Sequence, residues 1–114
     1  MKRFEVWLAN LNPQRSAEIG KVRPVLIVQS NLLSDVGHPS TLICPITTNV
    51  NADLKILRVA LAIGEGGLDR PSDVIIDQLR AVDNKRLITR KGKIATESIK
   101  KVKHNINVVL DLDW

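Results

Sequence analysis

The sequence predicts a mainly β domain in which a small curled sheet or barrel packs against one C-terminal helix. Its 114 residues suit a single domain covering 1–114. Most of the chain divides into short apolar runs rich in Val and Ile, with turn residues between them, a pattern typical of strands. From Thr96 onward, apolar residues instead recur at helical spacing. Strands followed by one amphipathic helix indicate a sheet that buries one face under that helix.

The first half of the chain contains three expected strands. The run FEVWLANL alternates in part between apolar and polar residues and predicts a strand over residues 4–11. The run PVLIVQ is apolar almost throughout and too short for a helix, so residues 24–29 are expected to form a central strand. TLICPIT predicts the next strand over residues 41–47, in which Pro45 indicates an edge or a bulge.

The second half adds two or three further strands. KILRVALA alternates and predicts a strand over residues 55–62, and DVIIDQLRAV predicts one strand over residues 73–82. ITRKGKI, at residues 88–94, predicts a short strand or a pair of turns. The segment GEGG is not followed by Lys-Ser or Lys-Thr, so it is not a phosphate-binding loop of the nucleotide-binding kind, and we expect a mobile loop there.

Two helical segments are expected. A helical turn should begin at Ser30 or Asn31, and the C-terminal helix should begin at Thr96, a residue type that caps helices. The apolar stripe of this second helix consists of Ile99, Val102, Ile106, Val109 and Leu110.

The charge pattern favours a polyanionic partner. The net charge is +5 and the sequence pI is about 9.7. The stretch from Lys85 to Lys103 alone has eight Lys and Arg residues against Glu97, so the rest of the chain is slightly acidic. Such a balance favours nucleic acid first and an acidic protein second. We predict that part of this stretch binds RNA or an acidic segment of a protein partner.

The sequence also predicts the compartment and the kind of chemistry. Cys44 is the only cysteine, so no intrachain disulfide can form and a reducing compartment is expected. No signal peptide and no membrane-spanning apolar run is seen, which predicts a soluble cytoplasmic protein. No Cys, His and Asp residues have metal-ligand spacing, so we expect neither a metal nor another cofactor. His38 and His104 are expected in a loop and at the border of the helical stripe, rather than as an acid–base pair.

Arg23 is the first candidate for a functional residue. Pro24 restricts the backbone of Arg23 to extended conformations and removes one donor, so we expect Arg23 at the entrance of the strand over residues 24–29. Arginine suits bidentate contact with phosphate. The alternative is that Arg23 has no functional role and is simply a surface residue that precedes a strand.

Other polar residues are expected at the same rim of the sheet. If the strand over residues 41–47 runs antiparallel to its predecessor, Thr47 and Thr48 lie beside Arg23. The polar loop before Arg23 opens onto this rim as well. A cation, hydroxyls and a carboxylate would then converge on a candidate phosphate site. The loop residues concerned are Gln14, Arg15, Ser16 and Glu18.

Three blocks of the sequence resemble the MazF/PemK toxins of bacterial toxin–antitoxin systems. These blocks are VWLANLNPQRSAEIGKVRPVLIVQS, CPITT and VIIDQLRAVD, in the order and at the spacing typical of the family. The specific motifs are E-x-G-x-x-R-P at Glu18 to Pro24, P-I-T at Pro45 to Thr47 and D-Q-x-R at Asp77 to Arg80. The resemblance covers nearly the whole chain.

The resemblance implies an SH3-like barrel with a C-terminal amphipathic helix that acts as a homodimer. It further implies a metal-free endoribonuclease that cuts single-stranded RNA at short sequences and is neutralised by a cognate antitoxin, expected here to be acidic. The expected cleavage ends are a 2′,3′-cyclic phosphate and a 5′-hydroxyl. By motif, Arg23 and Thr47 correspond to the catalytic pair and Glu18 to a supporting carboxylate. The expected RNA contacts are Arg15, Ser16, Thr48, Gln78 and Arg80.

The chain departs from the family pattern in two places. Phe4-Glu5 stands where Gly-Asp is usual, and Ser16 to Ile19 stands where Gly-Ser-Glu-Gln is frequent. The loop departure leaves Arg23 and Thr47 unaltered but leaves the RNA sequence preference open. Two other functions are considered: a gyrase poison that cuts nothing and depends on C-terminal residues such as Trp114, and a non-catalytic barrel that binds nucleic acid.

Overall fold

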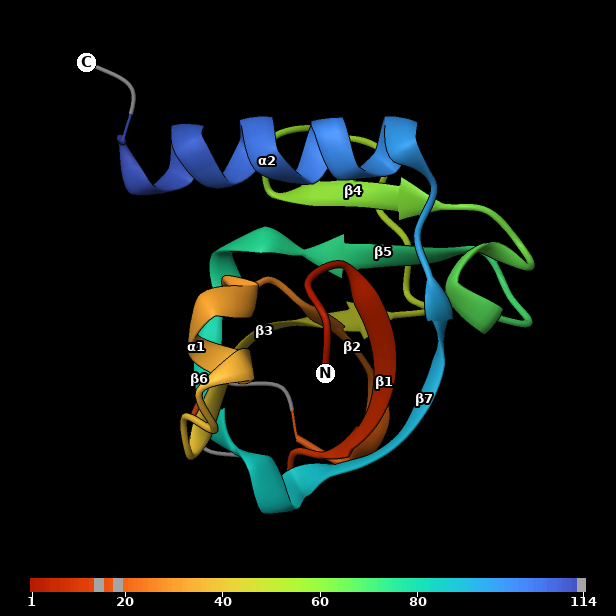
Figure 1. The fold of residues 1–114 in the computed structure, drawn as a ribbon. Helices are drawn as coiled ribbons and strands as arrows, with labels where there is room; N and C mark the ends of the chain where they lie inside the picture. The colour runs from red at the N-terminus through yellow and green to blue at the C-terminus, as the bar shows by residue number, and fades with distance from the viewer. Residues whose placement is uncertain (14–15, 18–19, 113–114) are drawn as a thin grey trace.

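The computed structural model describes residues 1–13, 16–17 and 20–112, and the order of its elements follows the sequence pattern closely (Figure 1). Within these residues, seven strands precede the long C-terminal helix, and a short helix follows the second strand. The strands are β1 Glu5–Asn10, β2 Val22–Ile27, β3 Ser40–Thr47, β4 Arg58–Leu61, β5 Ser72–Ile75, β6 Arg80–Asp83 and β7 Leu87–Lys93. The helices are α1 Asn31–Asp35 and α2 Thr96–Leu110, and the 3-10 turns are η1 Glu65–Gly67, η2 Ile76–Gln78 and η3 Asn84–Arg86.

The strands form one curled antiparallel sheet that stays open. The order is β4-β5-β3-β2-β1-β7, and β6 pairs with β3 beside β5. β4 and β7 end the sheet and do not pair with each other, so the expected mainly β fold is confirmed while the word barrel is too strong. Figure 1 shows the strands, β1 among them, curling into an open ring, with α2 lying alongside β4.

The two central strands are neighbours, as predicted, and their prolines fall where the ladder is interrupted. β2 runs antiparallel to β3, and the pairing begins at Val25 opposite Pro45. β2 covers Val22–Ile27 rather than residues 24–29, so Arg23 lies inside the strand and not at its entrance, which corrects the expected boundary. At Pro24, β2 pairs with β1 but not with β3. The backbone N–H that proline lacks is therefore not needed for the β2–β3 ladder.

Pro45 occupies a gap on the other side of β3. Ser40–Ile43 of β3 pair with β6, whereas Ile46 and Thr47 pair with β5. Neither partner reaches Pro45, which again spares a ladder hydrogen bond and agrees with the irregularity that this proline indicated.

The single strand expected over residues 73–82 is wrong. η2 divides it into β5 and β6, both of which pair with β3. Ile46 faces Val74, so an unbroken strand would bring Asp77 opposite Ile43; Arg80 lies there instead. The turn therefore inserts three residues and bends the chain around the gap at Pro45. The strand expected over residues 55–62 is also shorter, since β4 covers only Arg58–Leu61.

α2 confirms the helix predicted from apolar spacing, with two corrections at its ends. Val102 is buried, and Ile99, Ile106 and Val109 pack against the same core cluster. Leu110 is exposed, because the helix projects past the sheet at this end (Figure 1). The N-cap is Ala95 rather than Thr96, and no side chain of the cap residue bonds the first turn.

Glu65 supplies the contact that a capping side chain would otherwise make. Its Oε2 accepts from the backbone N–H of Ala95 at 3.0 Å, and its Oε1 accepts from Ala62 at 3.2 Å. Burial would raise the pKa of Glu65, but hydrogen bonds from Ser98, Ala95 and Ala62 and the charge of Lys101 lower it. The segment GEGG is thus a packed 3-10 turn against β7 and the helix start, not the mobile loop that was expected.

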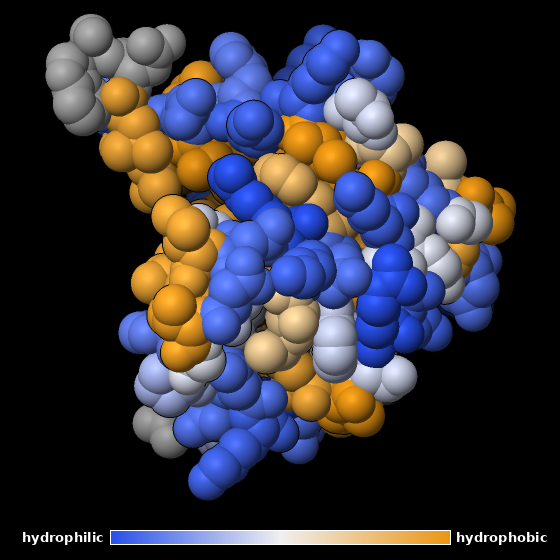
Figure 2. Space-filling model, viewed as in Figure 1, coloured by the Kyte–Doolittle hydropathy of each residue, from blue (hydrophilic) through white to orange (hydrophobic). Residues whose placement is uncertain are grey.

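The core lies on both faces of the curled sheet. The larger cluster packs against α2, and a second cluster is formed by Ala9, Leu11, Val25, Ile27, Ile43 and Val82. Figure 2 shows apolar side chains gathered over α1 and near the C-terminal end of α2, where Leu32, Val36, Leu110 and Leu112 are exposed. No helix in the described part of the chain is long and apolar enough to cross a membrane.

Candidate functional site

Arg23 and Thr47 come from adjacent ends of the two central strands. Val25 faces Pro45 in the β2–β3 ladder, so the side chains of this pair share a face of the sheet. Arg23 and Thr47 each lie two residues beyond that pair, and side chains two residues apart on a strand return to the same face. The antiparallel pairing predicted from the sequence is confirmed. The ladder ends at Val25 and Pro45, and Arg23 and Thr47 lie just beyond this last pair at the same end of the two strands.

The guanidinium of Arg23 is half-buried and held from one side. Its Nε donates to the carbonyl oxygen of Gly20 at 2.9 Å. Burial lowers the pKa of Arg23, but an arginine so placed keeps its charge at neutral pH. The two terminal nitrogens form no hydrogen bond to the described residues, so they can donate to a phosphate.

The hydroxyl of Thr47 is held in a complementary way. Its Oγ1 accepts from the backbone N–H of Asn49 at 3.1 Å. The hydroxyl hydrogen is then available for donation to a substrate oxygen. Thr47 is half-buried, whereas Thr48 after it is exposed.

Gln78 and Arg80 reach the same region from the other side of β3. Arg80 faces Ile43 in the β3–β6 ladder and so shares the face of the sheet from which Thr47 projects. The Nε2 of Gln78 donates to the carbonyl oxygen of Ala17 at 3.2 Å. Gln78 therefore fastens the loop before β2 to the turn between β5 and β6.

The loop before β2 is described only in part. Ser16 is exposed with a φ of 53°, and Gly20 is buried beside Arg23. Arg15 and Glu18 lie outside the described residues, so the RNA contact expected of the first and the carboxylate role expected of the second remain predictions.

A buried ion pair adjoins Thr47 and was missed at the sequence level. Asp73 faces Thr47 in the β3–β5 ladder, and its Oδ2 accepts from Nη1 of Arg58 at 3.1 Å. The same oxygen accepts from the backbone N–H of Asn51 at 2.8 Å. The partners are far apart in the sequence and no local pattern joins them, so only the folded register could reveal the pair.

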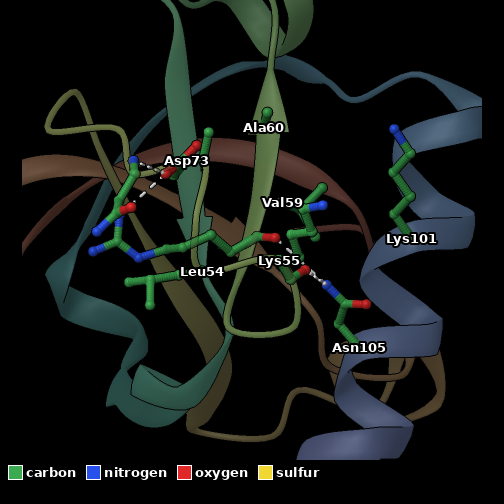
Figure 3. Close-up of a pocket in the computed structure, with 10 residues that line it drawn as sticks. Leu54, Lys55, Val59, Ala60, Asp73, Lys101 and Asn105 are labelled. Atoms are coloured by element: carbon green, nitrogen blue, oxygen red, sulfur yellow. Dashed lines mark hydrogen bonds and ion pairs between the residues drawn. The ribbon is translucent and has the colours of Figure 1, made fainter.

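The ion pair forms one end of a pocket of about 400 Å³ between the β3–β4 loop, β4 and α2 (Figure 3). Figure 3 shows Asp73 at one side and Asn105 of α2 at the other, where Nδ2 of Asn105 donates to the carbonyl oxygen of Lys55. Lys55 and Lys101 add positive charge to the lining. The remaining lining residues are Asn51, Ala52, Leu54, Val59 and Ala60.

The basic stretch from Lys85 to Lys103 is divided between structural and exposed cations. Arg86 donates to the carbonyl oxygens of Asn10 and Asn12, and Arg90 pairs with Glu5. The other six cations are exposed on η3, β7 and α2, and one of them, Lys100, pairs with Glu97; they are Lys85, Lys91, Lys93, Lys100, Lys101 and Lys103. RNA or acidic-partner binding by this stretch therefore stays a prediction for the exposed members.

Other reactive groups take no part in this arrangement. Cys44 is buried, and burial together with the charge of Asp77 raises the pKa of its thiol to about 12, so it is no nucleophile at neutral pH. Among residues 1–13, 16–17 and 20–112, no group of three or more His, Cys, Asp or Glu side chains could hold a metal ion. His104 is exposed on α2, and His38 is exposed before β3.

Known proteins share both the sequence pattern and the fold. Residues 2–110 match the model of the PemK-like, MazF-like toxins of type II toxin–antitoxin systems. The chain is 30% identical over 115 residues to the endoribonuclease MazF of Staphylococcus saprophyticus, covering 98% of this chain and 92% of that protein.

Solved structures agree on the fold. MazF from Deinococcus radiodurans superposes with a TM-score of 0.82 at 20% identity, covering 97% of this chain and 96% of that one. A mycobacterial endoribonuclease in complex with its cognate antitoxin gives a TM-score of 0.76 at 18% identity, covering 100% of this chain and 96% of that one. With the family match across residues 2–110 and a relative that is 30% identical along nearly its whole length, the chain belongs to the PemK-like, MazF-like toxins of type II toxin–antitoxin systems.

Proposed function

We propose that this protein is an endoribonuclease toxin that cuts single-stranded RNA at short sequence motifs without a metal ion. The observation that supports it most is the convergence of Arg23 and Thr47 at neighbouring strand ends, on one face of the sheet. The Staphylococcus saprophyticus relative is itself named an endoribonuclease, which supports the reaction class. The basic net charge of +5 suits an RNA substrate.

Arg23 would stabilise charge on the scissile phosphate. When the 2′-hydroxyl of a ribose attacks the adjacent phosphorus, negative charge grows on the phosphoryl oxygens, and a fixed cation lowers the energy of that state. The bond to Gly20 holds the guanidinium before substrate arrives, so less ordering is left to the binding step. An arginine with a pKa normally above about 12 is a poor proton donor, so charge stabilisation is its role here.

Thr47 and Glu18 would complete the chemistry. The Thr47 hydroxyl would donate to a phosphoryl oxygen, because its own oxygen already accepts from Asn49. Glu18 would take the proton of the attacking hydroxyl. Departure of the 5′-oxygen, which takes up a proton from solvent water, then leaves a 2′,3′-cyclic phosphate on one fragment and a 5′-hydroxyl on the other. Arg15, Ser16, Thr48, Gln78 and Arg80 would contact the flanking nucleotides.

The partners proposed are a second copy of the chain and an acidic antitoxin. The mycobacterial endoribonuclease with the same fold was solved with its cognate antitoxin, which supports a protein inhibitor here. The exposed lysines on β7 and α2 suit an acidic segment. A homodimer would cover apolar residues left exposed on α1 and near the end of α2.

The direct test is incubation of purified protein with a defined single-stranded RNA in excess chelator. Discrete fragments are expected, and mass spectrometry should find 2′,3′-cyclic phosphate and 5′-hydroxyl ends. A protein that cuts only when divalent metal is added would contradict the metal-free reaction. A protein that binds RNA without cutting, or cuts nothing and inhibits gyrase, would contradict the proposed function itself.

A further inference from the structure

We propose that the buried ion pair between Asp73 and Arg58 positions the Thr47 hydroxyl for cleavage. The proposal rests on the endoribonuclease function proposed above, because the readout of Thr47 is the cleavage rate. It assigns positioning roles to two residues that the sequence motifs do not include.

The first step is the placement of the carboxylate. Asp73 lies directly opposite Thr47 in the β3–β5 ladder, so the two residues project from the same face of neighbouring strands. The Asp73 side chain is only 5% exposed, and that of Arg58 is 19% exposed. A charged pair in this position is unusual beside a proposed reacting group. The free-energy penalty of removing two charges from water often exceeds the electrostatic attraction that the pair gains.

The second step is the connection from Arg58 to Thr47. Nη1 of Arg58 donates to Oδ2 of Asp73 and also to the backbone carbonyl oxygen of Asn49, at 3.2 Å. The N–H of the same residue, Asn49, is the donor that Thr47 Oγ1 accepts from. Asp73 thus acts through Arg58 on the residue that orients the hydroxyl.

The third step is the closing contact at the far end of the turn. Oδ2 of Asp73 accepts from the backbone N–H of Asn51, two residues beyond Asn49. The chain leaving β3 is therefore fastened at Asn49 and again at Asn51 by the same ion pair. With its oxygen committed to Asn49, Thr47 has one preferred direction in which to donate its hydrogen.

The network predicts a specific kinetic signature. Asp73→Asn keeps the size of the side chain but removes the charge that holds Arg58. The maximal single-turnover rate should fall about tenfold, in line with the loss expected when a catalytic group is misplaced by a fraction of an ångström. The RNA concentration that gives half the maximal rate should change by less than about twofold, since no RNA contact is removed. Arg58→Met should act like Asp73→Asn, and Arg58→Lys should recover part of the rate.

A double-mutant cycle separates positioning from general weakening of the fold. If Asp73 acts through Thr47, Asp73→Asn should cost less than about twofold further in a Thr47→Ala background. In an Arg23→Lys background it should still cost about tenfold, because the hydrogen bonds that join Asp73, Arg58 and Thr47 do not include Arg23. An equal tenfold loss in the Thr47→Ala background would overturn the proposal.

The control is a second ion pair away from this network. Glu5 and Arg90 join β1 to β7, with 2.6 Å between Oε2 and Nε. Glu5→Gln should lower the unfolding temperature yet leave the cleavage rate within about twofold of wild type. Matching rate losses in Glu5→Gln and Asp73→Asn would show that stability alone governs the rate, and would also overturn the proposal.

Amide hydrogen exchange tests the network without any cleavage. In Asp73→Asn and in Arg58→Met, the amides of Asn49 and Asn51 should exchange at least about tenfold faster, while those of the central pair Leu26 and Cys44 stay as in wild type. Unchanged exchange at Asn49 and Asn51 would overturn the positioning network while leaving the nuclease intact. A wild-type protein that cuts no RNA would instead overturn the proposed function, and exchange would still report on the network. If Asp73→Asn does not fold, Arg58→Lys supplies the same comparison.

Discussion

At the residue scale, one nitrogen of the Arg23 guanidinium, Nε, already donates a hydrogen bond to Gly20. This bond fixes the orientation of the guanidinium and leaves its two terminal nitrogens for a ligand. A planar fork with Nε fixed presents its two remaining nitrogens in a defined plane, which suits two oxygens of one phosphate. Lysine has no such fork and cannot reproduce both the anchor and the contact. Thr47 is held in a similar way. Its Oγ1 accepts from the backbone N–H of Asn49, which leaves the hydroxyl hydrogen for donation to a substrate.

Glu5 gives a residue-scale prediction about pH. Burial would raise its pKa, but hydrogen bonds from the Lys2 backbone, Arg90 and Trp7 outweigh burial and lower it to about 2. Because the pKa is lower in the folded state than in the unfolded state, the stabilisation is present above the ordinary pKa of 4.5 and is lost as pH falls toward 2.

The substitution Glu5→Gln should therefore be most destabilising at neutral pH. We expect a loss of about 1 kcal/mol in the free energy of unfolding, or roughly 4–8 °C in the unfolding midpoint, which is the scale of one ordinary protein hydrogen bond. Thermal unfolding of both proteins from pH 7 down to pH 2.5 checks this. The difference in unfolding midpoint between wild type and Glu5→Gln should narrow steadily below about pH 4.5. A difference in unfolding midpoint that stays constant across this range would show that folding does not lower the pKa of Glu5.

At the scale of elements, the pairing of β2 with β3 was predictable and the break between β5 and β6 was not. Two apolar runs separated by a polar connection predict neighbouring strands, and the prolines marked where their ladders are incomplete. The run DVIIDQLRAV has no Gly or Pro to announce a turn, so η2 was invisible at the sequence level. The bend depends on β3 meeting two separate partners, which is a tertiary effect.

The capping of α2 shows the same limit. Threonine is a residue type that often caps helices, which favoured Thr96 as the cap. In the structure, the carboxylate of Glu65, from a turn distant in the sequence, accepts from the backbone N–H of Ala95 at the start of the helix. The ion pair of Asp73 with Arg58 likewise joins residues that no local pattern connects. Sequence therefore predicted the residues at the strand ends, Arg23 and Thr47, and not the contacts that hold them.

Gly92 provides an element-scale prediction about how η1 packs on β7. A Cβ at Gly92 would lie 2.7 Å from the backbone carbon of Gly66 and 2.8 Å from the nitrogen of Gly67, and backbone cannot give way cheaply. Gly92→Ala should destabilise the protein by about 2–3 kcal/mol, the upper part of the range for overpacking.

The control for Gly92 is Gly37, where a Cβ would meet nothing within 4 Å. Gly37 has a φ of +75°, so Gly37→Ala should cost only the left-handed backbone penalty of about 1 kcal/mol. Urea unfolding measures both. Equal losses in the free energy of unfolding in the two variants would mean that η1 does not pack tightly against β7 at Gly92.

At the scale of the whole molecule, a small domain leaves apolar surface that a second copy can cover. Leu32 and Val36 of α1 are 79% and 80% exposed, and Leu110 and Leu112 are exposed near the end of α2. A chain of this length buries a limited fraction of its surface on folding, and association extends the buried area. Light scattering at micromolar concentration should therefore report twice the 12.7 kDa of one chain. A monomer across that range would contradict the homodimer.

The antitoxin prediction also belongs to the whole molecule, because it depends on the overall distribution of charge. An acidic peptide that competes with RNA should bind more weakly as salt is added, since exposed lysines contribute through screened attraction. It should also block cleavage of RNA in proportion to its occupancy. Titration of one synthetic acidic segment at two salt concentrations, with cleavage followed in parallel, tests both statements. Binding that ignores salt would argue against attraction led by charge.

The central claim is that Arg23 and Thr47 at neighbouring strand ends form the cleavage site. Single-turnover cleavage of one RNA by folded variants tests it most directly. Arg23→Ala should lower the rate roughly 10²-fold or more, as removal of one transition-state donor does in other enzymes. Arg23→Lys should recover part of the loss, and Thr47→Ala should cost less than Arg23→Ala. Lys2→Ala removes the same charge from an exposed ion pair with Asp35 and should leave the rate unchanged. Cleavage by Arg23→Ala within about threefold of wild type, less than the tenfold change equal to roughly 1.4 kcal/mol, would contradict the account.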